Sequence, residues 1–108
     1  MDSVLHALAE PNRRKILALL RGSERAAGAI ADTFMISRPA VSQHLKVLVE
    51  AGLVSARKDG VRRFYRLRPE GLSDLRGYLD SFWDAPLDRL KRAAEAEDRS
   101  HRDGRNSG

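Results

Sequence analysis

The chain has 108 residues, of which 42% are hydrophobic and 6% aromatic, and it contains no cysteine. A chain of this size forms one small domain with a modest core, so burial of apolar surface against a second copy is favoured. The missing cysteines exclude thiolate metal sites and disulfide switches, and the net charge of +5 favours a polyanionic partner.

Two short helices are expected at the N-terminus. Ser3 is a favoured cap for the first helix. Pro11 suits the first turn of the next helix, because its missing N–H has no helical partner there, and Gly22 ends that helix. We expect both helices to belong to the dimerisation scaffold.

The sequence from residue 27 to residue 52 predicts a helix-turn-helix. Residues 27–33 form a short helix, and Met35 and Ile36 make the turn. Ser37 is a favoured cap for a second helix, Pro39 suits its first turn, and Gly52 takes the left-handed conformation that ends it. These residues alone also fit two packed helices without a role in DNA binding.

The second of these helices separates into two faces. Val41, Leu45 and Leu48 fall at i, i+4 and i+7 and predict a buried stripe. The opposite face carries hydrogen-bonding side chains, with no acid before the end of the helix: Arg38, Ser42, Gln43 and Lys46. Such a face can contact base edges and phosphates in the major groove of DNA.

A basic β-hairpin is predicted directly after this helix. Residues 53–57 and 61–68 alternate in part and are joined through Asp59 and Gly60, a strong turn signal. The basic residues of the hairpin are Arg57, Lys58, Arg62, Arg63, Arg66 and Arg68. A basic hairpin beside a recognition helix is a wing, which contacts phosphates or the minor groove. We expect Arg57 and Arg68 to belong only to a solvated face.

An apolar stripe runs through the C-terminal part of the chain. Its members are Leu72, Leu75, Leu79, Phe82, Leu87, Leu90 and Ala94. A small core cannot cover so many apolar positions, so we expect a subunit interface with Tyr78 and Trp83 as anchors at its edge. Pro86 predicts a kink or a new helix start capped by Asp84. The residues from 97 onward are polar and predict a disordered tail.

Three motifs resemble ArsR-type winged-helix repressors. Residues 9–17 (AEPNRRKIL) are similar to the opening of that family, residues 37–48 (SRPAVSQHLKVL) to its recognition helix, and residues 60–67 (GVRRFYRL) to its wing. The similarity extends into residues 82–91. This resemblance implies an obligate homodimer that represses transcription and is released from its operator by an effector.

The sequence therefore predicts a mainly helical winged helix-turn-helix protein with four helices, a β-hairpin wing and a fifth helix, assembled as a dimer. Residues 1–96 form the DNA-binding and dimerisation domain, and residues 97–108 form the tail. The expected function is sequence-specific regulation of transcription by a homodimer that binds an inverted-repeat operator in double-stranded DNA. No signal peptide or long apolar run appears, which predicts a cytoplasmic protein without a membrane partner. The effector is left open.

The predicted site residues fall into two sets. The DNA-binding set is Ser37, Arg38, Pro39, Ser42, Gln43, His44, Lys46, Lys58, Arg62 and Arg63. The dimer-interface set is Val4, Leu5, Leu8, Leu75, Leu79, Phe82, Trp83, Leu87 and Leu90. Within the first set, Ser42 and Gln43 read bases, Arg38 contacts a base or the flanking backbone, and the other cations position the dimer on phosphates.

Metal and enzyme chemistry are not expected. The three histidines, His6, His44 and His101, lack the ligand spacing of zinc sites, so we predict no metal and no cofactor. Ser42 and His44 are two positions apart on a helix and point about 200° apart, so they cannot share a proton as nucleophile and base. Two alternatives stay open, a winged-helix module that binds a protein and a nucleoid-type protein that binds DNA without sequence preference.

Overall fold

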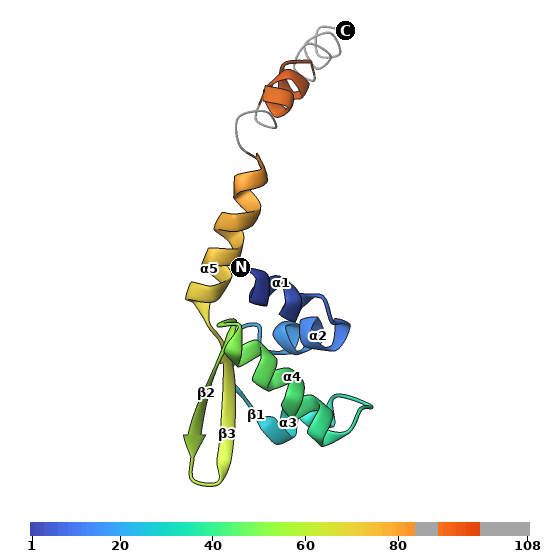
Figure 1. Ribbon diagram of the computed structural model, residues 1–108, viewed down its shortest axis with the longest axis vertical. Coiled ribbons are helices and arrows are strands. Elements are labelled where there is room, and N and C mark those ends of the chain that lie inside the picture. Colours follow the sequence, from blue (N-terminus) through green and yellow to red (C-terminus); the bar gives the residue numbers. More distant parts are fainter. Residues whose placement is uncertain (84–88, 98–108) are drawn as a thin grey trace, which may run out of the picture. The chain divides into compact units, whose positions relative to one another are not determined.

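The computed structural model describes residues 1–83 and 89–97, which fall into two compact units. The first unit spans Met1–Leu75, and the second begins at Arg76 (Figure 1). The helices are α1 (Asp2–Leu8), α2 (Pro11–Leu19), α3 (Ala27–Asp32), α4 (Arg38–Glu50) and α5 (Pro69–Asp80). The strands are β1 (Arg25–Ala26), β2 (Val54–Asp59) and β3 (Arg62–Leu67). A 3-10 turn, η1 (Ser81–Trp83), follows α5, and residues 89–97 are helical.

The first unit has one apolar core, to which α1 to α4 and the base of the hairpin contribute. Its fully buried side chains are Ile16, Leu20, Ile30, Val41, Leu45, Leu48, Leu53 and Val54. The stripe predicted on α4 is confirmed, because Val41, Leu45 and Leu48 are at most 1% exposed. The core therefore determines which face of α4 remains in contact with solvent.

The ends of the helices follow local hydrogen bonding. Ser37 caps α4 as predicted, and its Oγ accepts a hydrogen bond from the Ala40 amide at 3.2 Å. Gly52 has φ +79°, the left-handed conformation expected after the end of α4. The expected cap at Ser3 is wrong, because α1 already begins at Asp2. α2 is capped by the Glu10 side chain, which accepts from the Arg13 amide.

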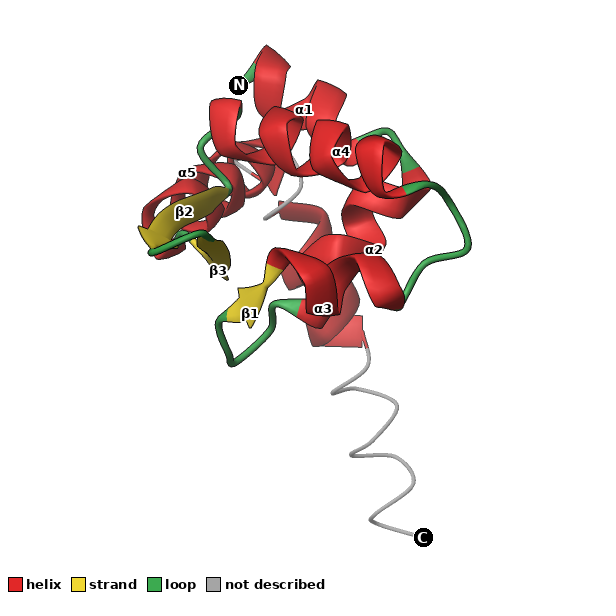
Figure 2. Cartoon of the chain, turned by 90° about the horizontal axis from the view of Figure 1, so that it is seen from below, coloured by secondary structure: helices red, strands yellow, loops and turns green. Residues whose placement is uncertain are grey.

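The β2–β3 hairpin pairs with a third strand, β1, that the sequence analysis did not predict. β1 pairs antiparallel with β3, through Arg25 opposite Tyr65 and Ala26 opposite Phe64, so the sheet order is β1-β3-β2. A strand of two residues is too short for an alternating pattern, which explains why it was missed. Figure 2 shows β1 leading directly into α3. The wing is thus joined by hydrogen bonds to the start of the helix-turn-helix.

The start of α5 approaches the α4–β2 connection closely. Gly71 is buried, and a Cβ atom at this position would collide with the Gly52 carbonyl group. Only glycine can occupy such a contact without moving the backbone. Leu72 and Leu75 are half-buried and pack against the core. The predicted kink at Pro86 and residues 98–108 of the predicted tail lie outside the described residues. Residue 97, which the sequence analysis placed at the start of the tail, is helical.

No helix among the described residues is both long enough and apolar enough to cross a membrane.

Candidate nucleic-acid interface

The exposed face of α4 carries the polar side chains that the sequence predicted there. Arg38, Ser42, Gln43 and Lys46 are all exposed, whereas the buried stripe lies on the opposite side of the helix. Arg38 pairs with Asp32 at 2.9 Å, but both side chains are about 70% exposed. An exposed ion pair of this kind contributes little to stability, so Arg38 can exchange Asp32 for another anion.

A groove lies between α4 and the wing, which comprises β2, β3 and their turn. It has a volume of about 770 Å³. From α4 it is lined by Pro39, Ser42, Gln43, Lys46, Val49 and Glu50, and from β2 and β3 by Ala56, Arg63 and Tyr65. Ala27 and Val61 complete the lining. We call this hollow the wing groove. It brings Gln43 and Arg63, which are far apart in the sequence, to one surface.

The outer part of the wing is basic and exposed. Lys58 pairs with Arg63 and Asp59 with Arg62 in the β2–β3 register, and all four side chains are exposed. Val61, at the tip, is 103% exposed. The only acid among these residues is Asp59, so the tip carries a net positive charge that attracts a polyanion.

Arg57 belongs to the support of the wing. Its guanidinium contacts both Glu24 carboxylate oxygens, with Nη2 2.7 Å from Oε1 and Nε 3.1 Å from each oxygen. The hydrogen bonds from Arg57 lower the pKa of the Glu24 carboxyl below its ordinary value, and Glu24 raises the pKa of Arg57. This pair connects the wing to the residue that precedes β1. The expectation of a merely solvated Arg57 is therefore wrong.

An aromatic ring supports two guanidinium groups on the wing. The Arg57 guanidinium carbon lies 4.6 Å from the centroid of the Phe64 ring, and that of Arg62 lies 5.0 Å from it. Cation–π contacts of this length restrict the side chains that make them. The sequence analysis missed both Glu24 and Phe64 as supporting residues. Glu24 is 33 positions from Arg57, whereas Phe64 lies directly opposite Arg57 in the β2–β3 register, a relation that the register of the predicted hairpin could have shown.

His44 lies away from the exposed face of α4, so its placement in the DNA-binding set needs correction. Its side chain is 17% exposed, and its Nε2 is 3.8 Å from the Glu10 carboxylate. An Nη1 hydrogen of Arg13 points to His44 Nδ1 at 3.4 Å. Arg13 is itself buried and donates to the carbonyls of Ala7 and His6 at 2.7 and 3.0 Å. His44 thus connects α4 with the α1–α2 junction.

The predicted dimer-interface residues occupy different environments. Val4 is buried in the core of its own domain, and Leu8 and Leu75 are half-buried against that core. The exposed members are Leu5 at 37%, Leu79 at 45%, Phe82 at 54%, Trp83 at 57% and Leu90 at 65%. Leu87 lies outside the described residues. In the second unit, the Tyr78 and Phe82 rings meet edge to face at 5.1 Å.

Within residues 1–83 and 89–97, no three His, Cys, Asp or Glu side chains come together in a group that could hold a metal ion.

Known proteins of similar sequence and structure are regulators of transcription. Residues 10–56 match the family described as "Bacterial regulatory protein, arsR family". The chain is 45% identical to the HTH-type transcriptional regulator Rv2034 of Mycobacterium tuberculosis, over 89% of this chain and 90% of that protein. It is 39% identical to the transcriptional repressor SdpR of Bacillus subtilis, over 76% of this chain and 91% of that protein.

A solved structure shares the fold. It is the solution structure of a homodimeric winged helix-turn-helix DNA-binding domain from Mycobacterium bovis, a possible ArsR-family transcriptional regulator. The two chains are 36% identical with a TM-score of 0.62, and the match covers 77% of each. The chain therefore belongs to the arsR family of bacterial regulatory proteins and is a transcriptional regulator with a winged helix-turn-helix DNA-binding domain.

Proposed function

We propose that this protein represses transcription as a homodimer that binds an inverted repeat in double-stranded DNA. The observation that carries the proposal is the wing groove, because it places Ser42 and Gln43 of α4 beside Arg63 of the wing. A helix with hydrogen-bonding side chains fits the major groove, while a basic hairpin next to it can contact flanking phosphates or the minor groove.

Each exposed polar residue of this surface has a proposed role. Ser42 and Gln43 read base edges, and Arg38 contacts a base or the flanking backbone after leaving Asp32. The phosphate contacts come from Lys46, Lys58, Arg62 and Arg63. Ser37 and Pro39 lie at the exposed start of α4, which in this proposal enters the major groove of DNA. We leave out His44, because it faces Glu10 and Arg13.

The homodimer is proposed from apolar side chains that the single chain leaves exposed. Leu79, Phe82, Trp83 and Leu90 are each 45% to 65% exposed, and burial against a second copy would remove this surface from water. Leu5 is a further exposed candidate, with Leu8 and Leu75 at the margin. The homodimeric domain from M. bovis supports this assembly. We exclude Val4, which its own domain already buries.

Repression is proposed because the similar protein SdpR is named a repressor. The proposal includes a cytoplasmic location, where bacterial DNA is found, and no catalytic step.

Selection of bound genomic fragments followed by footprinting tests the proposal. We expect an inverted repeat whose half-sites are roughly 10 bp apart, or a multiple of that, because a two-fold dimer presents two recognition helices. Light scattering on the free protein should give the mass of two chains. Protection of one asymmetric half-site at stoichiometric protein, or equal affinity for the selected site and a scrambled duplex, would contradict the proposal.

A further inference from the structure

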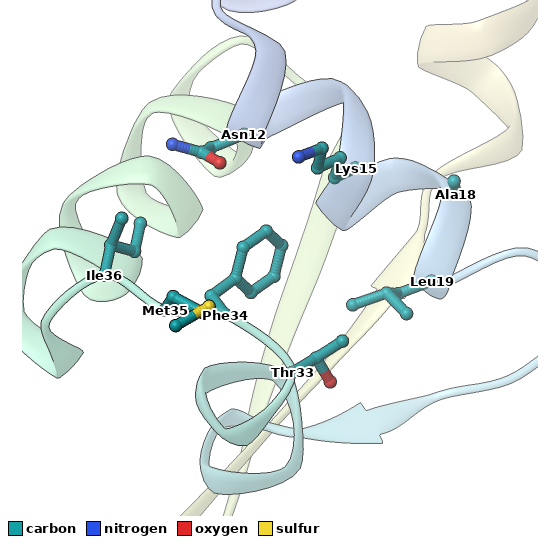
Figure 3. Close-up of a pocket in the computed structure, with 8 residues that line it drawn as sticks. All are labelled: Asn12, Lys15, Ala18, Leu19, Thr33, Phe34, Met35 and Ile36. Carbon is teal, nitrogen blue, oxygen red and sulfur yellow. The ribbon is translucent and has the colours of Figure 1, made fainter.

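A second hollow lies between α2 and the turn that joins α3 to α4 (Figure 3). Its volume is about 520 Å³, within the range of sites that hold small molecules. Asn12, Lys15, Ala18 and Leu19 of α2 form one side, and residues 33–36 form the other. We call this hollow the turn pocket.

The walls of the turn pocket are mainly apolar. Leu19, Phe34 and Ile36 are half-buried and pack against the core, so these walls are already in place before any ligand arrives. Figure 3 shows the Phe34 ring near the centre of the pocket, directed toward α2. Met35 borders the pocket with a fully exposed side chain, and its flexible thioether chain can pack against an apolar ligand of irregular shape.

The polar groups of the turn pocket favour an anion. Lys15 is the one charged residue in the lining, which contains no carboxylate. Lys15 takes part in none of the ion pairs found among the described residues. Asn12 lies beside it and donates one N–H to Glu10 at 3.4 Å, which leaves a second amide hydrogen for a ligand. The hydroxyl of Thr33 already donates to the Ala29 carbonyl.

We propose that the turn pocket binds a small organic monocarboxylate with an apolar body, and that this ligand weakens operator binding. The carboxylate contacts Lys15 and Asn12, and the apolar body packs on Leu19, Phe34 and Met35. The ligand site stands on the pocket alone, whereas its effect on DNA rests on the proposed function.

The pocket and the DNA-facing helix share one continuous segment. Ile36 lines the pocket, and the next residue is Ser37, which caps α4. Arg38 follows and pairs with Asp32 across the turn. A bound monocarboxylate neutralises Lys15 and so removes one positive charge from beside the segment that approaches phosphates, which makes ligand and DNA oppose each other. By linkage, DNA must weaken ligand binding by the same factor.

Titration of the full-length protein, observed by NMR, tests the ligand site. Decanoate and phenylbutyrate should each shift the backbone amides of Ala18, Thr33 and Met35 in a saturable way, whereas decylamine should not. Lys15→Gln should weaken carboxylate binding about tenfold. Arg21→Gln is the matched control, because it removes the same charge from an exposed residue just after α2 that does not line the pocket.

Several results would overturn the ligand site. These are an absence of saturable shifts, equal shifts with decylamine, or equal carboxylate affinity in Lys15→Gln and Arg21→Gln. Shifts of the same amides that depend on protein concentration alone would also overturn it, since they would mean that a second copy occupies the pocket.

Operator affinity at saturating decanoate tests the coupling. We expect a loss of about fivefold or more in the unaltered protein and in Arg21→Gln, and a smaller loss in Lys15→Gln at the lowest decanoate concentration that saturates the unaltered protein. Ligand binding without any change in operator affinity would overturn the coupling while the site stands. A protein that binds no operator even without ligand would contradict the proposed function and the coupling, and the carboxylate titration would still decide the ligand site.

Discussion

The two elements that border the wing groove are held in place by different forces. α4 is anchored by Val41, Leu45 and Leu48, which are almost completely buried. The outer wing is anchored by surface contacts, namely the Arg57–Glu24 pair and the guanidinium groups over Phe64. Apolar burial does not depend on charge, whereas an exposed ion pair weakens with salt and with protonation of its acid.

This difference predicts different roles for α4 and the wing in DNA binding. The orientation of α4, the proposed base-reading helix, should persist under changes of pH and salt that loosen the outer wing. The wing should then determine general affinity and its salt dependence more than sequence preference.

Leu45→Ala should have the largest effect and lower the free energy of unfolding by about 2–5 kcal/mol, because it leaves a cavity beneath α4. Urea denaturation of the full-length protein measures this loss. Lys46→Ala, at the exposed neighbouring position, should stay within about 0.5 kcal/mol of the unaltered protein. Equal stabilities of the two variants would show that the core does not anchor α4.

Gln43→Ala and Arg63→Ala should differ in kind, although both residues line the wing groove. Loss of Gln43 should relax the preference at one base pair by about 1–3 kcal/mol. Loss of Arg63 should weaken binding to all sequences and reduce the salt slope by about one unit. Binding to a panel of single-base operator variants at several salt concentrations measures both effects. Uniform weakening by both substitutions would remove the distinction between helix and wing.

Glu24→Gln should release Arg57 from its carboxylate partner. The freed guanidinium can then contact phosphate, so the salt dependence of DNA binding should steepen by about one unit. The ratio of the affinity for the operator to the affinity for random duplex should fall. Glu70→Gln is the control, since it removes the same charge from an exposed acid beside Arg68, away from the wing groove. If the two variants have the same salt slope, Glu24 has no special influence on the wing.

The smallest expected effect is the weakening of the Glu24–Arg57 pair at low pH. Hydrogen bonds from Arg57 lower the pKa of Glu24 below its ordinary value of 4.5. A lowered pKa in the folded protein means that the pair stabilises the wing above pH 4.5 and that this contribution fades as the pH falls toward the folded-state pKa. An NMR titration of the Glu24 carboxyl should therefore have a midpoint below 4.5. The midpoint should rise in Arg57→Gln, and a midpoint equal in both proteins would argue against the pair.

Sequence reasoning succeeded where the physical signal is local. The cap at Ser37, the buried stripe on α4 and the left-handed Gly52 depend on neighbours within a few residues, and all three are confirmed. The predicted hairpin is confirmed, but its turn is Gly60 and Val61, because Asp59 is the last residue of β2 and pairs with Arg62. The cap at Ser3 failed because α1 starts two residues earlier, with Met1 at the cap position and the acidic Asp2, which suits a helix start, as its first residue.

Sequence reasoning failed where two distant segments decide the outcome. β1 exists because its two residues pair with β3, and Arg57 has a partner because Glu24, 33 positions earlier, ends beside it. His44 could not be placed from helical spacing alone, because its direction depends on where the α1–α2 junction packs.

The sequence by itself determined the order of the helices, the polar face of α4 and the basic wing, because helix caps, periodicity and turn residues act over short distances. The tertiary structure alone decided that Gln43 and Arg63 share the wing groove, and that Lys15 and Phe34 border the turn pocket. Each of these sites joins segments that meet only when the apolar core closes, and the energy of that closure depends on buried area, not on distance along the chain.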